Sequence, residues 1–411
     1  MAGSSETRAP AVTAADIARA RTAIGDVVRR TPVLPSSTLS ERCGGRVVLK
    51  AESLQRTGAF KLRGALAKLA ALGDACSAGV VCGSAGNHAQ ALAMAARARG
   101  VPCEVFMPAE APVAKVEATA ELGAQVRVGG VSVDECLARA REHAGESGMT
   151  FVHPFDDPDV VAGQGTLGLE LLEDVPDLAT VVVPVGGGGL ASGIAIAIKS
   201  ARPDVRVVGV QVEAVAAFPA SLRAGHPIPV DAHLTIADGI AVKRPGDLTL
   251  ALIREWVDDV VVVSEDDVAD AMVLLLEKAK LVVEGAGAVG VAALLAGAVP
   301  AAEAGTTCVV LSGGNVDAGL LAEVARRHET QAGRRVVLLT RVPDRPGALA
   351  QLLNCVAATG ANIVEVTHLR EGIGLHIRET GVQLVIQTRS RAHADAVQRA
   401  VVGAGYGVTR Y

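Results

Sequence analysis

A lysine and three loops of small residues are the parts of this sequence best suited to chemistry. Lys61 lies in the stretch Thr57–Ala65, where a helix is expected to begin. Taken alone, such a lysine is usually a solvated charge on an apolar stem. It becomes a candidate to carry a covalent cofactor only if other motifs supply a place for that cofactor.

The first of these loops is a run of four glycines, Gly186, Gly187, Gly188 and Gly189, followed by Leu190. The run lies between an apolar strand and an apolar helix. Its consecutive N–H groups, at the positive end of the helix dipole, can hold a phosphate. One or two glycines would suffice for a plain turn, so four favour an anion. No Walker lysine follows and the dinucleotide fingerprint is absent, which indicates a single phosphate.

Two further loops also follow expected strands. Ser84–Gln90 can present N–H groups to a substrate carboxylate, and the Asn87 side chain offers a donor to an oxygen. The alternative is an ordinary capping turn with Asn87 as N-cap. Ser312–Asn315 places a serine hydroxyl where it could bond a ring nitrogen, although alone this loop is more typical of another turn.

The composition restricts the class of partner. The chain has 411 residues, 50% of them hydrophobic but only 2% aromatic, and 45 glycines, which is typical of an α/β protein. A formal charge of −5 without a basic block argues against nucleic-acid or anionic-membrane binding and favours a small-molecule partner. The uncharged runs 180–198 and 285–302 are broken by glycine and proline, so no membrane segment is expected.

The cysteines and the N-terminus bear on localisation. Seven cysteines without a C-x-x-C pair suggest neither a disulfide framework nor a zinc site. No metal-ligating residue is predicted, and a monovalent cation stays open. Met1–Pro10 lacks the apolar run of a signal peptide. A cytoplasmic protein is predicted.

Hydrophobic patterning places the loops on a scaffold of two open, twisted, mostly parallel sheets with a cleft between them. Strands and helices alternate over a smaller region, about 51–152, and again from about 164 to 311. The strands expected are 47–50, 79–82, 103–106, 125–128, 150–152, 181–185, 207–211, 260–263 and 307–311. The helices expected are 13–30, 62–72, 87–99, 112–121, 132–143, 164–172, 190–199, 266–279 and 286–296.

The character of the chain changes near Gly333. The remaining residues predict strand, helix, two strands, helix and strand, the ferredoxin-like βαββαβ order. The elements expected are strand 334–340, helix 345–357, strands 362–369 and 376–387, helix 392–402 and strand 407–411.

The four motifs in this order on an α/β scaffold resemble the fold-type II pyridoxal-phosphate (PLP) enzymes, and among them the threonine/serine dehydratases (threonine ammonia-lyases). The resemblance covers about residues 13–330 and includes the motifs Ala237–Val242 and Glu284–Ala288. The tail resembles an ACT regulatory domain through Arg341–Leu349. The implied domains are a catalytic domain over 1–330 and an ACT domain over 334–411.

The resemblance implies catalytic roles for Lys61, which would bond PLP covalently and then act as general base, and for Ser84. Phe60 would pack near the cofactor ring, and Ser312 would bond its nitrogen. The other implied cofactor contacts are Asn87 to the 3-hydroxyl oxygen, Gly186, Gly187, Gly188, Gly189 and Leu190 to the phosphate, and Gly239 and Glu284 lining the pocket. The implied substrate contacts are Ser84, Gly86, Asn87 and His88.

The chemistry implied is loss of the hydroxyl from a β-hydroxy amino acid, giving an enamine that hydrolyses to a 2-oxo acid and ammonia. A serine at the ring nitrogen, unlike a carboxylate, should disfavour transamination. L-Threonine would give 2-oxobutyrate, and L-serine pyruvate. Ala59 stands where relatives usually have serine, and Ala85 where serine racemases have a proton-transfer serine, so racemisation is disfavoured.

Two alternatives stay open. The first is a dehydratase that prefers serine or another β-hydroxy amino acid. The second is a protein that has lost catalysis and retains amino-acid binding through the tail.

The tail itself has two interpretations. It is either a purely structural domain that helps form a homodimer or homotetramer, or an amino-acid sensor. The implied effector contacts are Asp344, Pro346, Gly347, Leu349 and Asn362.

Overall fold

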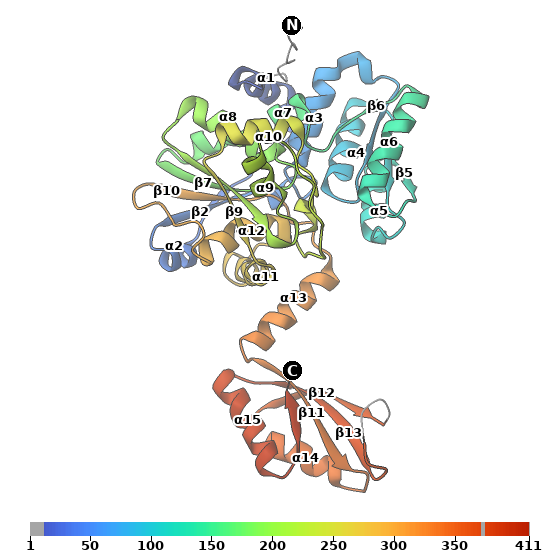
Figure 1. The fold of residues 1–411 in the computed structure, drawn as a ribbon, viewed down its shortest axis with the longest axis vertical. Coiled ribbons are helices and arrows are strands. Elements are labelled where there is room, and N and C mark those ends of the chain that lie inside the picture. Colours follow the sequence, from blue (N-terminus) through green and yellow to red (C-terminus); the bar gives the residue numbers. More distant parts are fainter. Residues whose placement is uncertain (1–11, 371–374, 411) are drawn as a thin grey trace. The chain divides into compact units, whose positions relative to one another are not determined.

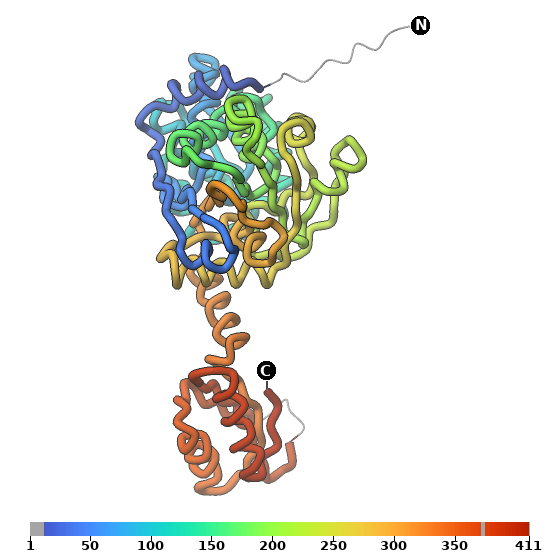
Figure 2. The backbone as a smooth tube through the Cα atoms, turned by 90° about the vertical axis from the view of Figure 1, so that its left-hand side faces the viewer, coloured from blue at the N-terminus to red at the C-terminus, as the bar shows by residue number. Residues whose placement is uncertain are grey.

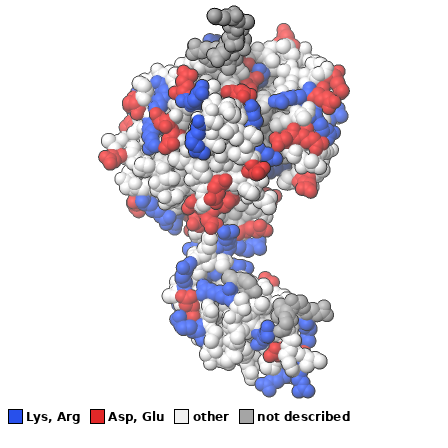
Figure 3. All heavy atoms as spheres, viewed as in Figure 1, with Lys and Arg blue, Asp and Glu red and all other residues white. Residues whose placement is uncertain are grey.

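The structure is a computed structural model and describes residues 12–370 and 375–410, so the expectation for Met1–Pro10 lies outside the described residues. The chain forms two compact units, which divide between Val316 and Asp317. Acidic and basic side chains are interspersed on the face of the first unit shown in Figure 3.

The first unit contains a six-stranded sheet whose strand order is β1-β2-β10-β7-β8-β9 (Figure 1). All neighbours are parallel except β1, which pairs with β2 in the antiparallel sense. The strands are β1 (Val33–Pro35), β2 (Arg46–Ala51), β7 (Leu178–Pro184), β8 (Arg206–Val212), β9 (Asp259–Val263) and β10 (Thr306–Leu311).

A second sheet in this unit has the order β5-β4-β3-β6 and is entirely parallel. Its strands are β3 (Val80–Gly83), β4 (Cys103–Met107), β5 (Gln125–Val128) and β6 (Thr150–Phe151). Two open, mostly parallel sheets of unequal size confirm the predicted fold class. The loop from Ser84 follows β3, the tetraglycine loop follows β7, and the loop from Ser312 follows β10, so each lies at the carboxyl end of a strand.

Helices α1, α3, α7 and α8 pack against one another beside these sheets (Figures 1 and 2). The apolar part of their contact is built from alanine, valine, leucine and isoleucine rather than aromatic rings. Among the described residues, no helix is both long and apolar enough to cross a membrane. The helices of the first unit are α1 (Ala14–Ile24), α2 (Ser37–Cys43), α3 (Lys61–Leu72), α4 (Asn87–Arg99), α5 (Val113–Glu121), α6 (Val133–Ser147), α7 (Pro158–Asp174), α8 (Gly189–Ala201), α9 (Ala217–Ala224), α10 (Asp247–Trp256), α11 (Glu265–Leu274) and α12 (Gly285–Leu295).

Several boundaries differ from the sequence prediction. The helix expected to open at Gln164 begins at Pro158, because Asp157 caps it by accepting hydrogen bonds from two backbone N–H groups. The helix expected over 266–279 ends at Leu274 and continues as a π-helix over Leu275–Ala279. Strand β1 and helices α2, α9 and α10 were not predicted; all four are short segments of ten residues or fewer.

The second unit is the predicted βαββαβ fold, preceded by a helix that was not predicted, α13 (Ala318–Gln331). Its antiparallel sheet has the order β12-β13-β11-β14. Leu338, Leu352, Leu384 and Val397 lie in its own apolar core. The elements are β11 (Arg335–Pro343), α14 (Ala348–Ala357), β12 (Asn362–Leu369), β13 (Glu379–Gln387), α15 (Arg391–Gly403) and β14 (Val408–Arg410).

Candidate active site

Lys61 is the first residue of α3, and its side chain is partly buried. Its Nζ donates a hydrogen bond to the Pro154 carbonyl oxygen at 2.7 Å and lies 5.2 Å from the centroid of the Phe60 ring. Burial lowers the pKa of Lys61 to about 8, against a smaller opposing attraction from Glu284. A large share of this amine is therefore neutral near pH 8, as a nucleophile or a general base must be.

The segment before Lys61 is fixed to the loop that follows β10. Phe60 N–H donates to the Ser312 carbonyl at 3.1 Å, and Gly314 N–H donates to the Gly58 carbonyl at 2.8 Å. Gly58 has a φ of +70°, and a Cβ there would lie 2.3 Å from Oδ1 of Asn315. Only glycine fits this position without displacing Asn315.

A hydrogen-bonded row of side chains lies beside the lysine. Asn315 Nδ2 donates to Asn87 Oδ1 at 2.7 Å, and Asn87 Nδ2 donates to Glu284 Oε1 at 2.7 Å. Burial raises the pKa of Glu284 to about 7, and Asp238 adds to the rise. The row fixes the orientation of the Asn87 amide, and one N–H of that amide stays available for a ligand oxygen.

The tetraglycine loop joins β7 to α8, and Gly188 has a φ of +95°. Thr249 Oγ1 donates to the Gly187 carbonyl at 2.6 Å, so the carbonyl side of the loop is held. Within the described part of the chain, no hydrogen bond is donated by the N–H groups of 186–190. Five donors at the start of a helix fit a phosphate group.

Phe155 packs so closely against this loop that a side chain at Gly187 or Gly189 would collide with it. A Cβ on Gly187 would lie 2.2 Å from Cγ of Phe155, and one on Gly189 would lie 3.0 Å from the Phe155 carbonyl oxygen. Phe155 directly follows Pro154, whose carbonyl binds Lys61. The loop and the lysine are therefore connected through two adjacent residues.

Gly239 and Glu284, the remaining residues predicted to line the pocket, lie close to the tetraglycine loop and to each other. A Cβ on Gly186 would lie 3.0 Å from Ile240 Cα, and one on Gly239 would lie 3.6 Å from Glu284 Oε1. The structure thus brings together residues from six separate segments of the chain. They are Phe60 and Lys61, Asn87, the loop 186–190, Gly239, Glu284 and Ser312.

The loop after β3 supplies donors from its backbone. Gly86 caps α4, and its N–H donates to Ser84 Oγ at 3.2 Å. The N–H groups of Asn87 and His88 donate to no acceptor within 12–370 and 375–410. The His88 ring is buried, with Nε2 3.1 Å from the Val152 carbonyl oxygen, and burial lowers its pKa to about 3. The N–H of His88, rather than its ring, is left to bind a substrate.

The Ser312 side chain is buried at the carboxyl end of β10. Its hydroxyl makes no hydrogen bond to another described residue. It is therefore free to bond a ring nitrogen without fixing that nitrogen's proton.

Sequence reasoning missed four residues of this site: Pro154, Phe155, Thr249 and Asn315. Asn315 ends the Ser312–Asn315 loop, and its amide three residues after the serine was the available signal. Pro154 accepts a hydrogen bond from Lys61 through its backbone carbonyl, and the Thr249 hydroxyl donates to the carbonyl of Gly187 in a distant loop. Neither contact has a sequence signature.

The effector residues predicted for the second unit do not all meet in one chain. Asp344 follows the end of β11 and pairs with Arg370 at 3.0 Å. Asn362 pairs with Gln387, which pairs with Arg335 at the other end of β11. Asp344 lies nine residues along the chain from Arg335, so about 30 Å of strand separates it from the level of Asn362. The effector site stays a prediction, and within one chain Asn362 is not part of a cluster with Asp344, Pro346, Gly347 and Leu349.

No group of three or more His, Cys, Asp or Glu side chains that could hold a metal ion occurs among the described residues.

Comparison of this sequence with known proteins identifies its family. The profile of the pyridoxal-phosphate dependent enzymes matches residues 24–313. The chain belongs to this family. It is 46% identical over 398 residues to the L-threonine ammonia-lyase of Thermotoga maritima, a match that covers 97% of this chain and 99% of that one. PLP is therefore its cofactor, as the sequence predicted.

Two solved structures have similar folds. A threonine deaminase from T.th. has a TM-score of 0.70 and 41% identity, covering 74% of this chain and 99% of that one. Maize serine racemase has a TM-score of 0.73 and 37% identity, covering 78% of this chain and 99% of that one.

Proposed function

We propose that this protein is a threonine ammonia-lyase, which converts L-threonine to 2-oxobutyrate and ammonia and also accepts L-serine, giving pyruvate. The relative that is 46% identical to this chain is named L-threonine ammonia-lyase. The observation that carries the proposal is the partly neutral Lys61 amine, held by Pro154, together with the loop 186–190 that packs on the adjacent Phe155. The five N–H groups of this loop donate to no acceptor among the described residues. This pairs an amine that can bond a carbonyl with a cradle for one phosphate.

The residues present fit PLP. Lys61 would hold its carbonyl carbon, the loop 186–190 its phosphate, Asn87 its 3-hydroxyl oxygen and Ser312 its ring nitrogen. When bound, this cofactor withdraws electrons from the substrate Cα, which makes the Cα proton removable.

The substrate carboxylate is proposed to bind the N-terminus of α4. The N–H groups of Asn87 and His88 have no other acceptor in the described structure. The His88 ring is neutral and bound to the Val152 carbonyl, so it adds no charge. Dipole and N–H groups then orient the carboxylate without a fixed cation.

Lys61 is proposed to move the proton. When its Nζ is not bonded to the cofactor, this amine would be able to take the substrate Cα proton, because a pKa of about 8 leaves much of it neutral. The protonated Nζ can then deliver a proton to the departing hydroxyl, which leaves as water. Hydrolysis of the released enamine consumes one water, so the overall reaction yields a 2-oxo acid and ammonia.

The neighbouring residues restrict side reactions. Ser312 does not hold a proton on the ring nitrogen as a carboxylate would, which disfavours transamination. Ala85 has no group that can transfer a proton to the opposite face of Cα, so D-serine should not accumulate. This separates the proposal from a racemase, despite the similarity in fold to maize serine racemase.

The second unit is proposed to sense an amino acid, and the full chain to act as a cytoplasmic homodimer or homotetramer. The βαββαβ fold supports the first proposal, and so does the start of α14 after β11, where no described side chain caps the helix. Retention of the catalytic lysine argues against a purely binding function.

One substrate panel tests the function. Purified protein with PLP should release ammonia and 2-oxobutyrate from L-threonine, and Lys61→Ala should abolish both the release and the visible-range absorbance of the bound cofactor. Faster turnover of L-serine than of L-threonine would favour the serine dehydratase instead. Ammonia release unchanged in Lys61→Ala would refute the proposal.

A further inference from the structure

A row of six charged side chains, alternating in sign, runs from the residue after β2, through the first turn of α3, to the protein surface. We call it the ion-pair chain. In order it consists of Glu52, Arg63, Glu170, Lys50, Asp174 and Arg30. Three positive and three negative groups make it neutral overall. Its first four members lie in the core, since Glu52, Arg63 and Lys50 are fully buried and Glu170 is nearly so.

Arg63 is the inner junction of this chain, and every one of its five N–H bonds is used. Its Nε and one terminal nitrogen donate to the two oxygens of Glu52 at 2.9 and 2.8 Å. Its terminal nitrogens also donate to both oxygens of Glu170 at 2.6 and 3.0 Å, and one of them to Thr166 Oγ1 at 3.2 Å. Only a planar guanidinium can satisfy two carboxylates in this way, so lysine is not an equivalent replacement.

The two carboxylates belong to different elements. Glu52 directly follows β2, and its Oε1 also accepts from Thr31 Oγ1 at 2.5 Å. Glu170 lies in α7, and its Oε2 is 2.7 Å from Lys50 Nζ. Arg63 therefore ties the start of α3 to the six-stranded sheet and to α7 at once.

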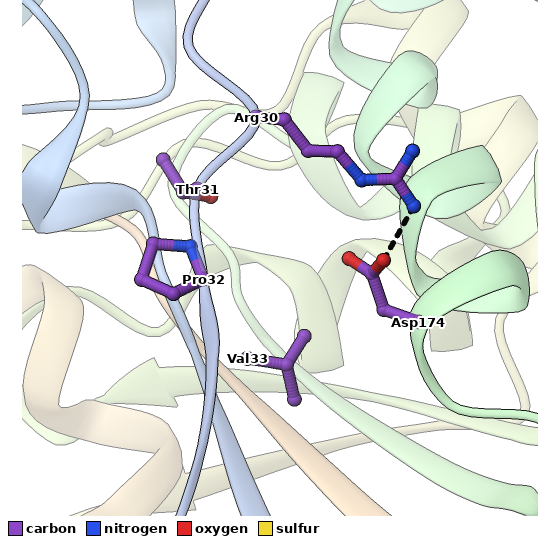
Figure 4. Close-up of a pocket in the computed structure, with 5 residues that line it drawn as sticks. All are labelled: Arg30, Thr31, Pro32, Val33 and Asp174. Carbon is purple, nitrogen blue, oxygen red and sulfur yellow. Dashed lines mark hydrogen bonds and ion pairs between the residues drawn. The ribbon is translucent and has the colours of Figure 1, made fainter.

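The outer end of the ion-pair chain reaches solvent. Arg30 and Asp174 pair across a pocket of about 350 Å³ whose other lining residues are Thr31, Pro32 and Val33. Figure 4 shows the Arg30 side chain reaching from the segment before β1 toward Asp174 at the end of α7. The ion pair is half-exposed here, in contrast to the buried pairs at Arg63.

Stability alone does not account for this arrangement. Burying charges costs free energy, and well-packed apolar residues in place of a buried ion-pair network are often equally or more stabilising. Removing one partner, however, leaves an uncompensated buried charge. What the network supplies beyond apolar packing is a fixed direction and register for the groups it joins.

Arg63 lies two residues after Lys61, about 200° further round the helix. The two side chains therefore leave the first turn of α3 on opposite sides, Lys61 toward Pro154 and Arg63 toward α7. The backbones are close here as well, because Gly64 N–H donates to Gln164 Oε1 at 3.2 Å and a Cβ on Gly163 would lie 2.6 Å from the Arg63 carbonyl oxygen. The contacts that hold Arg63 therefore also hold the backbone from which the Lys61 side chain extends.

We infer that Arg63 is a positioning residue for the reaction, which holds the first turn of α3 so that Lys61 Nζ stands where bond formation and proton transfer require it. The inference rests on the proposed function through the role of Lys61. It assigns Glu52 and Glu170 as the anchors of that turn. Displacement of a reacting group by about 1 Å can reduce the rate about 100-fold, so a loosened first turn should act mainly on kcat.

The experiment compares full-length holoenzymes that differ at Arg63 and at a matched control. Arg63→Lys keeps the positive charge but loses the planar guanidinium that donates to both oxygens of Glu52 and of Glu170. Lys68→Met is the control, because Lys68 lies on the same helix and also joins α3 to α7, through ion pairs of 2.7 and 3.0 Å to Asp157 and Asp159. For each protein we would measure kcat, KM, the pH midpoint of the cofactor's visible absorbance and the melting temperature.

The expected result for Arg63→Lys is a kcat lower by about 10- to 100-fold at nearly unchanged KM, with a displaced pH midpoint. Lys68→Met should lower the melting temperature while kcat and the midpoint stay as in the wild type. If Arg63→Lys does not fold, Glu52→Gln, which keeps the shape of the anchor, must show the same pattern in milder form.

A foldable Arg63→Lys or Glu52→Gln that keeps the wild-type kcat and pH midpoint would overturn the inference. So would an equal loss of kcat in Lys68→Met, since any loosening of the two helices would then suffice. A wild-type protein without ammonia release or a visible cofactor band would instead overturn the proposed function, so the two failures are distinguishable.

Discussion

The titration of Lys61 is the most quantitative consequence of this site. Burial lowers its pKa from the ordinary 10.5 to about 8. At pH 8 about half of such an amine is neutral, against about 0.3% of an ordinary lysine, so the reactive fraction is about 150-fold larger. Glu284 opposes the shift by attracting the charged amine. Replacing it by glutamine should therefore lower the pKa of Lys61 further.

The assay is competitive labelling of the full-length, cofactor-free protein. A trace of acylating reagent is applied between pH 6 and 11, with Nα-acetyl-lysine as the internal reference, and the labelled fraction of the Lys61 peptide is measured by mass spectrometry. The midpoint should lie near pH 8 in the wild type and below it in Glu284→Gln. Glu303→Gln, which changes an exposed carboxylate, is the matched control and should leave it unchanged.

The dependence on Glu284 has a defined pH range. Because burial raises the pKa of Glu284 itself to about 7, its carboxylate is charged mainly above pH 7 and can attract the Lys61 amine only there. The two proteins should therefore differ above pH 7 and converge below it. A wild-type midpoint near 10.5, or a midpoint that rises in Glu284→Gln, would refute the electrostatic reasoning.

Two further predictions concern the glycine loop and the second unit. Gly187→Ala places a Cβ 2.2 Å from Phe155 Cγ and should weaken PLP binding about 5- to 150-fold, the equivalent of about 1–3 kcal/mol of overpacking. The control Gly145→Ala, at an open helical site, should bind PLP normally and be stabilised by up to about 1 kcal/mol. Spectrophotometric titration with PLP measures the binding, and thermal melting measures the stability. A fragment spanning 317–411 should unfold cooperatively in urea, because it has its own apolar core; a gradual, non-cooperative loss of circular dichroism would contradict this.

The sequence predicted the α/β architecture because parallel strands and their helices carry regular hydrophobic patterns. Strand β5, helix α4 and strand β12 lie within the predicted limits. Short elements such as α2 and α9 lack a long periodic stretch, and their packing is decided by distant residues. The start of α7 was placed six residues too late, because a glycine-containing segment was interpreted as a helix start although the capping Asp157 lies upstream.

The site was predictable where distinctive residue types carry the chemistry and not where a backbone group of an ordinary residue makes the contact. Lys61, Asn87 and the glycine loop have recognisable types and spacing. The Pro154 carbonyl that holds Lys61 has none, and neither does the packing of Phe155 against the loop. The ion-pair chain also escaped sequence reasoning, because Arg63, Glu52 and Glu170 are spread over more than 100 residues and pair only through the fold.

The most direct test of the account is to locate the cofactor on the chain. Reduction of the PLP-loaded protein with borohydride should fix the cofactor covalently, and peptide mapping by mass spectrometry should find the added mass on Lys61. Lys61→Ala should show no such adduct. Finding the adduct on another lysine, or none at all in a protein with a visible cofactor band, would contradict the central claim that Lys61 carries the cofactor.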